Sequence, residues 1–253
     1  MIINIISTFR FCILYSIQFG SKIQLDSTID VQDIESIGFN NDGFQDIIVS
    51  ESRFGNPPTK LSMSLNLGNR NIDGLTTLEN LTSIRTFIAK GDFNNDGWDD
   101  IISYDTNLFI LINNQDTTFT KIDVAQQIHG VDTEVAVITN DTKEDIIVAT
   151  DGTLYVFSNQ TNLSFTEEII LMLLPSDHYT IEIADLYNDG FPEIIEGAFP
   201  FYVYNNNNGK IVYDSIVSNP NTPDAVFAVA TGDVNHDGHI NIVTSSACLN
   251  ELL

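Results

Sequence analysis

The sequence predicts an all-β fold built from small antiparallel sheets, one for each repeat of the chain. Three observations support this prediction. A loop motif recurs five times, the segments between its copies are short and rich in β-branched and aromatic residues, and no segment shows the period of an amphipathic helix. With 253 residues, 43% of them apolar, the chain can bury a substantial core.

The complete copy of the motif is GDFNNDGWDDII, at residues 91–102. Gly97, at position 6 of this loop, permits a sharp turn because a positive φ angle costs little without a Cβ. Ca²⁺ binds about six to eight oxygens in flexible geometry, so it suits this loop, with the Trp98 carbonyl as a further ligand. An EF-hand would need a bidentate Glu at position 12, where Ser103 stands, and flanking helices. The side-chain ligands would be those at positions 1, 3, 5 and 9: Asp92, Asn94, Asp96 and Asp100.

The copies of the motif are regularly spaced along the chain. They occupy residues 38–50, 91–103, 137–149, 184–197 and 232–245, and their turn positions lie 54, 45, 48 and 48 residues apart. Those turn positions are Gly43, Gly97, Thr142, Gly190 and Gly238. A period of about 40–50 residues is typical of propellers and solenoids, in which each repeat is one small unit. Four strands are expected in the second repeat, at 84–92, 100–104, 107–113 and 118–124.

A pair of isoleucines follows four of the five loops. Neighbouring side chains on a strand point to opposite faces, so each pair makes both faces of its strand apolar. This is expected when a sheet is packed between two others, and it favours the radially packed, four-stranded blades of a β-propeller over one sheet with a wet face. The pairs are Ile47-Ile48, Ile101-Ile102, Ile146-Ile147 and Ile194-Ile195.

The other copies differ from the second in their ligands, counting the position-7 carbonyl in each. The fifth keeps the spacing with fewer charges: Asp233, Asn235, Asp237, His239 and Asn241. The fourth has Tyr187 at position 3 and offers Asp185, Asp189, Phe191 and Glu193. The first has Gly38 at position 1 and offers Asn40, Asp42, Phe44 and Asp46. The third retains only Asp141 and Asp145, so we expect a plain turn there. The alternative is that all five are Asn/Asp-rich turns without metal.

The pattern Asp-x-Asn-x-Asp-Gly-x-x-Asp at 92–100, with its copies, resembles the FG-GAP/VCBS repeats, best known from the integrin α-subunit head domains. Gly197-Ala198 falls where that family shows a Gly-Ala-Pro element. The resemblance implies a seven-bladed β-propeller whose calcium ions stiffen loops and do no chemistry. About five blades' worth of chain is present, at 28–80, 81–126, 127–172, 173–220 and, in part, 221–253, so we expect a fragment rather than a smaller ring. Residues 1–27 are either a signal peptide or the last strands of a preceding blade.

Composition narrows the range of partners and compartments. The net charge of −25 opposes binding to nucleic acid or to an anionic membrane surface, and no apolar run is long enough to insert into a membrane. Loops with two or three carboxylates suit calcium affinities of about 10⁻⁴–10⁻³ M, which predicts an extracellular, secreted or cell-surface protein. Sequons at Asn80, Asn140, Asn159 and Asn162 are compatible with a secreted glycoprotein. The two cysteines, Cys12 and Cys248, do not form a disulfide framework.

No catalytic signature stands out. The NNNNGK segment at 205–210 lacks the earlier glycine of a P-loop, and His236 and His239 occupy non-ligand side-chain positions of the fifth loop. Carboxylates repeated in several blades favour metal loops over the single acid–base pair of a glycosidase. The sequence therefore predicts a non-catalytic, integrin α-like interaction or adhesion module that binds Ca²⁺ and a protein or glycan. The alternative is an accessory propeller of a larger secreted enzyme whose catalytic part is absent from this chain.

Overall fold

The structure is a computed structural model that describes residues 30–53, 56–69, 71–83, 86–128, 130–172, 178–198, 201–216 and 226–246. Residues 1–27, predicted as a signal peptide or strands of a preceding blade, lie outside the described residues. The described residues form four four-stranded antiparallel sheets and one two-stranded sheet, with a single 3₁₀ turn at Thr161–Leu163 and no α-helix. The prediction of an all-β protein with four-stranded antiparallel units is confirmed.

The strands of each sheet follow one another in the chain. The first sheet contains β1 (Asp30–Ile37), β2 (Asp46–Arg53), β3 (Asn56–Ser64) and β4 (Thr76–Leu81). The second contains β5 (Ile88–Gly91), β6 (Asp100–Tyr104), β7 (Asn107–Asn113) and β8 (Phe119–Gln126). The third contains β9 (Gly130–Ala136), β10 (Asp145–Thr150), β11 (Thr153–Asn159) and β12 (Phe165–Met172). The fourth contains β13 (His178–Ala184), β14 (Glu193–Ala198), β15 (Tyr202–Asn206) and β16 (Ile211–Ile216). The fifth contains β17 (Val226–Gly232) and β18 (Asn241–Ser246).

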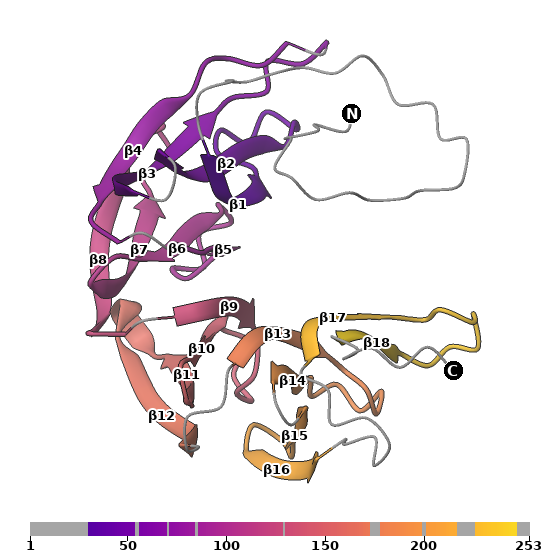
Figure 1. The fold of residues 1–253 in the computed structure, drawn as a ribbon. Helices are drawn as coiled ribbons and strands as arrows, with labels where there is room; N and C mark the ends of the chain where they lie inside the picture. Colours follow the sequence, from indigo (N-terminus) through magenta and orange to yellow (C-terminus); the bar gives the residue numbers. More distant parts are fainter. Residues whose placement is uncertain are drawn as a thin grey trace, which may run out of the picture.

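The sheets are arranged like the blades of a fan (Figure 1). The first strands, β1, β5, β9, β13 and β17, lie on the inner side of the arc and each contacts the next, while β4, β8, β12 and β16 lie on the outer side. As far as the described residues go, the arc is open. The five repeated loops that join first to second strands therefore all occupy the same place in their sheets.

The isoleucine pairs bury both faces of the second strands, as predicted. Ile101 belongs to the apolar cluster between the first and second sheets, where it packs with Ile48. Ile102 belongs to the cluster between the second and third sheets, with Ile146 and Phe157. All of these side chains are at most 1% exposed. The core is therefore a series of apolar layers between neighbouring sheets.

A buried asparagine also joins the second, third and fourth sheets to the sheet before each of them. Its side-chain Nδ2 donates to the carbonyl at position 2 of the preceding loop, and the three asparagines end β7, β11 and β15. The pairs are Asn113 with Phe39 at 3.1 Å, Asn159 with Phe93 at 2.9 Å and Asn206 with Ile138 at 2.9 Å. Each of the first three loops is thus fixed by the following sheet as well as by its own strands.

Strand boundaries in the second repeat differ from the sequence expectation at two places. The first strand spans only Ile88–Gly91, where 84–92 was expected, because its pairing with β6 runs from Ile88 opposite Ser103 to Gly91 opposite Asp100. The fourth strand reaches Gln126, two residues beyond the expected end, because Gln126 pairs with Asn107 at the start of β7. The two central strands have the expected limits.

Candidate metal-binding loops and a groove on the second sheet

The second loop, between β5 and β6, folds back at Gly97, which has a φ angle of 84°. Asp92 at position 1 organises the turn, since its Oδ1 accepts the Asp96 backbone N–H at 2.9 Å and its Oδ2 accepts the Gly97 N–H at 2.7 Å. Asn94 Oδ1 also accepts from the Asp96 N–H, at 3.0 Å, and Asp96 Oδ1 accepts the Trp98 N–H at 3.0 Å. The side chains at positions 1, 3 and 5 therefore all turn into the loop, where the sequence places them as ligands.

The carboxylate at position 9 has a structural role that sequence reasoning missed. Asp100 is fully buried, and it accepts the backbone N–H of Phe93 at 3.1 Å and that of Asn113 at 2.8 Å, which ties the loop to the end of β7. Burial raises the pKa of Asp100 to about 7, in spite of these two hydrogen bonds. Asp46, Asp145 and Glu193 make the corresponding pair of bonds in their own sheets.

The fourth and fifth loops repeat the hydrogen bonds of the second. Asp185 accepts the N–H groups of Asp189 and Gly190, at 3.0 and 2.9 Å. Asp233 accepts those of Asp237 and Gly238, at 3.1 and 2.9 Å. In the fifth loop Asn235 also accepts from Asp237, His239 donates its N–H to Asp237, and Asn241 accepts from Val234. In the fourth, Phe191 donates its N–H to Asp189. In the first loop Asn40 Oδ1 accepts the Asp42 N–H, and Asp42 Oδ1 accepts the Phe44 N–H. This loop lacks the position-1 side chain.

The third loop supplies its own cation. Lys143, at position 7, places its Nζ 3.4 Å from Asp141 Oδ2. Thr139 Oγ1 contacts Asp141 Oδ1 at 3.2 Å and Asp145 Oδ2 at 2.9 Å, so the remaining polar side chains of the loop bond to one another. The expectation of a plain turn without metal in the third loop stays a prediction, which the Lys143–Asp141 ion pair favours.

The second loop has the oxygen donor set that calcium prefers. In the second loop three carboxylates, one amide oxygen and one carbonyl are available, and all are oxygens. The ion pairs of the described residues are Lys90–Glu35, Lys121–Glu79 and Lys143–Asp141, and none of them neutralises a ligand of the first, second, fourth or fifth loop. Considering only His, Cys, Asp and Glu side chains, no group of three in the described residues is arranged to hold an ion. Binding therefore also requires the asparagines and backbone carbonyls, and the calcium assignment stays a prediction.

A second set of carboxyl groups lies on the inner strands. Asp33 Oδ2 accepts the Ile88 N–H of the second sheet at 2.7 Å, and Asp132 Oδ2 accepts the Ile181 N–H of the fourth at 2.8 Å. Burial, and after it the negative charges of the neighbouring carboxylates, raises the pKa of Glu134 to about 8; those carboxylates are Asp132, Glu182, Glu35 and Asp33. Sequence analysis did not identify this group, because its members are far apart in the chain and share no motif.

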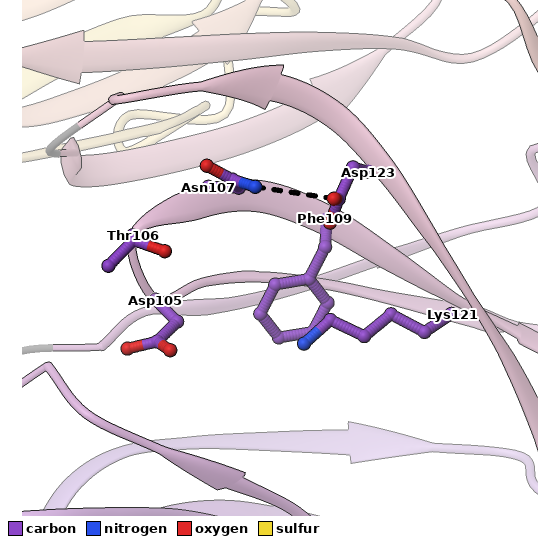
Figure 2. A pocket seen from close by; sticks show the side chains of 6 residues that line it. All are labelled: Asp105, Thr106, Asn107, Phe109, Lys121 and Asp123. Atoms are coloured by element: carbon purple, nitrogen blue, oxygen red, sulfur yellow. Dashed lines mark hydrogen bonds between the residues drawn. The ribbon is translucent and has the colours of Figure 1, made fainter.

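A polar groove of about 360 Å³ lies on the outer part of the second sheet (Figure 2). It is lined by Asp105, Thr106, Asn107, Phe109, Lys121 and Asp123. Asp105 Oδ1 is fixed by donors that directly follow β4, the N–H and Oγ1 of Thr82 and the N–H of Ser83, each at 2.8 Å.

The other groove side chains are also held in place. Lys121 lies over the Phe109 ring, 4.1 Å from its centroid, and pairs with Glu79 of β4 at 3.1 Å. Asn107 donates to Asp123 at 3.2 Å. The charge of the lysine is thus offset by Glu79, and the groove offers mainly carboxylate, amide and hydroxyl oxygens. Sequence reasoning could not find the groove, because its residues belong to no repeated motif.

The family comparison agrees with the repeated loops. The sequence profile of the FG-GAP-like repeat matches residues 38–103 and 138–195, which include the first and second loops and all but the end residues of the third and fourth. The chain belongs to the FG-GAP repeat family. The fifth loop of this FG-GAP repeat protein lies outside the matched segments, although its hydrogen bonds are those of the second. The comparison with curated protein sequences returned no match.

Solved structures resemble the fold of this FG-GAP repeat protein at low sequence identity. One is a lectin from Agrocybe aegerita that recognises non-reducing terminal N-acetylglucosamine, with a TM-score of 0.60 and 20% identity over 85% of this chain and 60% of the lectin chain. Another is the V. cholerae biofilm matrix protein Bap1, with a TM-score of 0.49 and 18% identity over 87% of this chain and 38% of that one. The chain thus spans less than two thirds of either structure. In the described residues, no helix is long and apolar enough to cross a membrane.

Proposed function

We propose that this FG-GAP repeat protein is a calcium-binding, non-catalytic module that binds a glycan or a protein outside the cell. The observation that carries the proposal is the repetition of one loop, with the same inward-turned side chains, in the second, fourth and fifth sheets. An active site normally occurs once in a chain, whereas structural ions recur with the repeat. The weak calcium affinity expected for these loops would be sufficient only where calcium is plentiful.

Calcium would hold the two ends of each loop together. In the second loop Asp92, Asn94, Asp96, the Trp98 carbonyl and Asp100 would provide the oxygens, and the ion would supply positive charge among three carboxylates. The fifth loop would use Asp233, Asn235, Asp237, the His239 carbonyl and Asn241, with less negative charge and weaker binding. In both cases the ion would join the first two strands of a sheet.

The sheets would be blades of a β-propeller, in which each sheet packs its apolar faces against its neighbours. Val243 in β18 stands where the second isoleucine of the pair stands in the other four sheets. It is 52% exposed. The equivalent isoleucines are 0% exposed because the following sheet covers them, and they are Ile48, Ile102, Ile147 and Ile195. An apolar face of this kind is suited to packing against another sheet of such a ring.

The groove on the second sheet is the binding site we propose for a glycan. Its carboxylate, amide and hydroxyl oxygens can accept hydrogen bonds from sugar hydroxyls, and its excess of carboxylates disfavours acidic sugars. The similar lectin fold supports this class of ligand without identifying the sugar.

Glycan binding in millimolar calcium tests the proposal. Immobilised neutral and acidic glycans would be screened with the wild-type protein, with Asp123→Ala in the groove, and with Asp116→Ala, an exposed carboxylate in a turn of the same sheet, as control. We expect binding of neutral glycans that Asp123→Ala weakens at least about tenfold and Asp116→Ala leaves unchanged. No binding, or equal binding by both variants, would contradict the groove, and turnover of a bound glycan would contradict the non-catalytic assignment.

A further inference from the structure

We propose that Glu144 of the third loop is a positioning residue for the calcium site of the second loop, so that one repeat controls the ion of its neighbour. The inference rests on the proposed binding of calcium by the second loop. Glu144 is not among the ligand positions of its own loop, and the third loop has no complete ligand set.

The contact is direct and specific. Glu144 Oε2 accepts the backbone N–H of Asp92, the residue at position 1 of the second loop. Gly91 makes room for it: a Cβ at residue 91 would lie 2.5 Å from Glu144 Oε2 and 2.8 Å from Val135 Cγ1. The carboxylate of Glu144 therefore reaches the backbone that carries the Asp92 side chain.

A second contact from the third sheet holds the next residue of the loop. Asn159, 1% exposed at the end of β11, donates to the Phe93 carbonyl at 2.9 Å. Positions 1 and 2 of the second loop are thus held by the third sheet, through one acceptor and one donor. Fixing the backbone at these positions fixes the direction of the Asp92 side chain, whose two oxygens accept the Asp96 and Gly97 N–H groups.

The first and second sheets are connected by the same two kinds of contact. Asp99, at position 8 of the second loop, accepts the Gly38 N–H of the first loop at 3.1 Å, and Asn113 donates to Phe39. Position 8 is Pro192 in the fourth loop and Ile240 in the fifth, so neither can make this contact with the loop before it. The carboxylate contact therefore acts on the first and second loops only.

The third loop is suited to this role because it does not need an ion. Its Asp141 is paired with Lys143, and its Asp145 is bonded to the N–H groups of Ile138 and Asn159. The third loop can hold Glu144 in place in the absence of calcium. Calcium can then bind to the second loop, whose backbone is already ordered. Preorganisation of this kind reduces the ordering that binding must otherwise supply.

Trp98 makes the second loop separately observable. It is the only tryptophan of the chain and stands at position 7 of that loop, so its fluorescence during a calcium titration reports this site. We would titrate wild-type protein, Glu144→Ala, Glu144→Gln and, as a charge control, Glu79→Gln on the outer strand β4. Glutamine keeps a hydrogen-bond acceptor, whereas alanine removes it.

We expect Glu144→Ala to weaken calcium binding at Trp98 about tenfold, as removal of residues that orient metal ligands commonly does, while Glu144→Gln keeps most of the affinity and Glu79→Gln all of it. Hydrogen exchange in excess chelator gives a reading without the ion, and Asp92 N–H exchange should be faster in Glu144→Ala. Unchanged affinity in Glu144→Ala, or equal losses in Glu144→Ala and Glu144→Gln, would overturn the positioning role. A different result would refute calcium binding by this loop: in the wild-type protein the Trp98 fluorescence does not change with calcium, while the Asp92 N–H stays protected from exchange.

Discussion

The carboxylates at position 9 show how one residue can serve both the fold and a metal. Asp145 is retained in the third loop, where Asp141 is the only other ligand residue left, and it is fully buried. Its bonds to the N–H groups of Ile138 and Asn159 explain this, because these buried donors would otherwise have no partner. A ligand pattern read from sequence alone assigns the residue to the metal and misses this role.

Replacement of Asp145 therefore tests the structural role where calcium is not involved. Asp145→Ala leaves two buried N–H groups unpaired, and we expect it to lower the free energy of unfolding by about 3 kcal/mol. Urea denaturation in excess chelator would measure the change. Asp141→Ala, whose ion pair with Lys143 is partly exposed, should cost less than about 1 kcal/mol. Equal effects of the two substitutions would refute the assignment.

The raised pKa of Glu134, about 8, predicts a pH effect on stability. The folded protein binds this proton more tightly than the unfolded chain, so the stability associated with the protonated group is fully present below about pH 4.5 and is lost as pH rises through 8. We expect Glu134→Gln to flatten the decline of the melting temperature between pH 6 and about 9 and to add about 2 kcal/mol at the upper end. If the melting temperatures of the wild type and the variant changed in parallel with pH, Glu134 would not be kept neutral by its surroundings.

At the level of elements, the sequence was informative where structure is local and repeated. The turn at Gly97 and the two-sided burial of Ile101 and Ile102 follow from spacing and strand alternation, and both were predicted. The contacts of Glu144 with Asp92 and of Asn159 with Phe93 were not, because they depend on how neighbouring sheets are aligned. The groove depends on the same alignment, since residues that directly follow β4 fix Asp105.

Asn159 provides a test of the connections between sheets. Its side chain is 1% exposed and its Nδ2 bonds to Phe93, so this sequon is closed to glycosylation in the folded protein, whereas Asn80 on β4 is exposed. When the chain is secreted from a eukaryotic host, glycopeptide mass spectrometry should find a glycan at Asn80 and none at Asn159. Asn159→Ala should also lower the melting temperature by several degrees, because it leaves the Phe93 carbonyl unpaired. A glycosylated Asn159 in folded protein would contradict the buried bridge.

At the scale of the whole molecule, the sheets depend on one another through apolar layers and through the first strands along the inner side of the arc. The net charge of −25 is spread over a chain with only 10 basic residues, so the loops that gather carboxylates have few cations to balance them. Divalent ions bound at several loops would therefore stabilise the assembly as a whole, and a melt of the intact chain reports their sum.

The direct test of the central claim is the thermal unfolding of the purified chain in millimolar calcium and in excess chelator, beside an Asp96→Ala, Asp237→Ala double variant. A site filled at ten times its Kd adds about 1.4 kcal/mol, so several sites should raise the midpoint by many degrees. We predict a large calcium-dependent rise that the double variant mostly loses. An unchanged midpoint in the wild-type protein would mean that the loops are Asn/Asp turns without metal, which contradicts the calcium assignment.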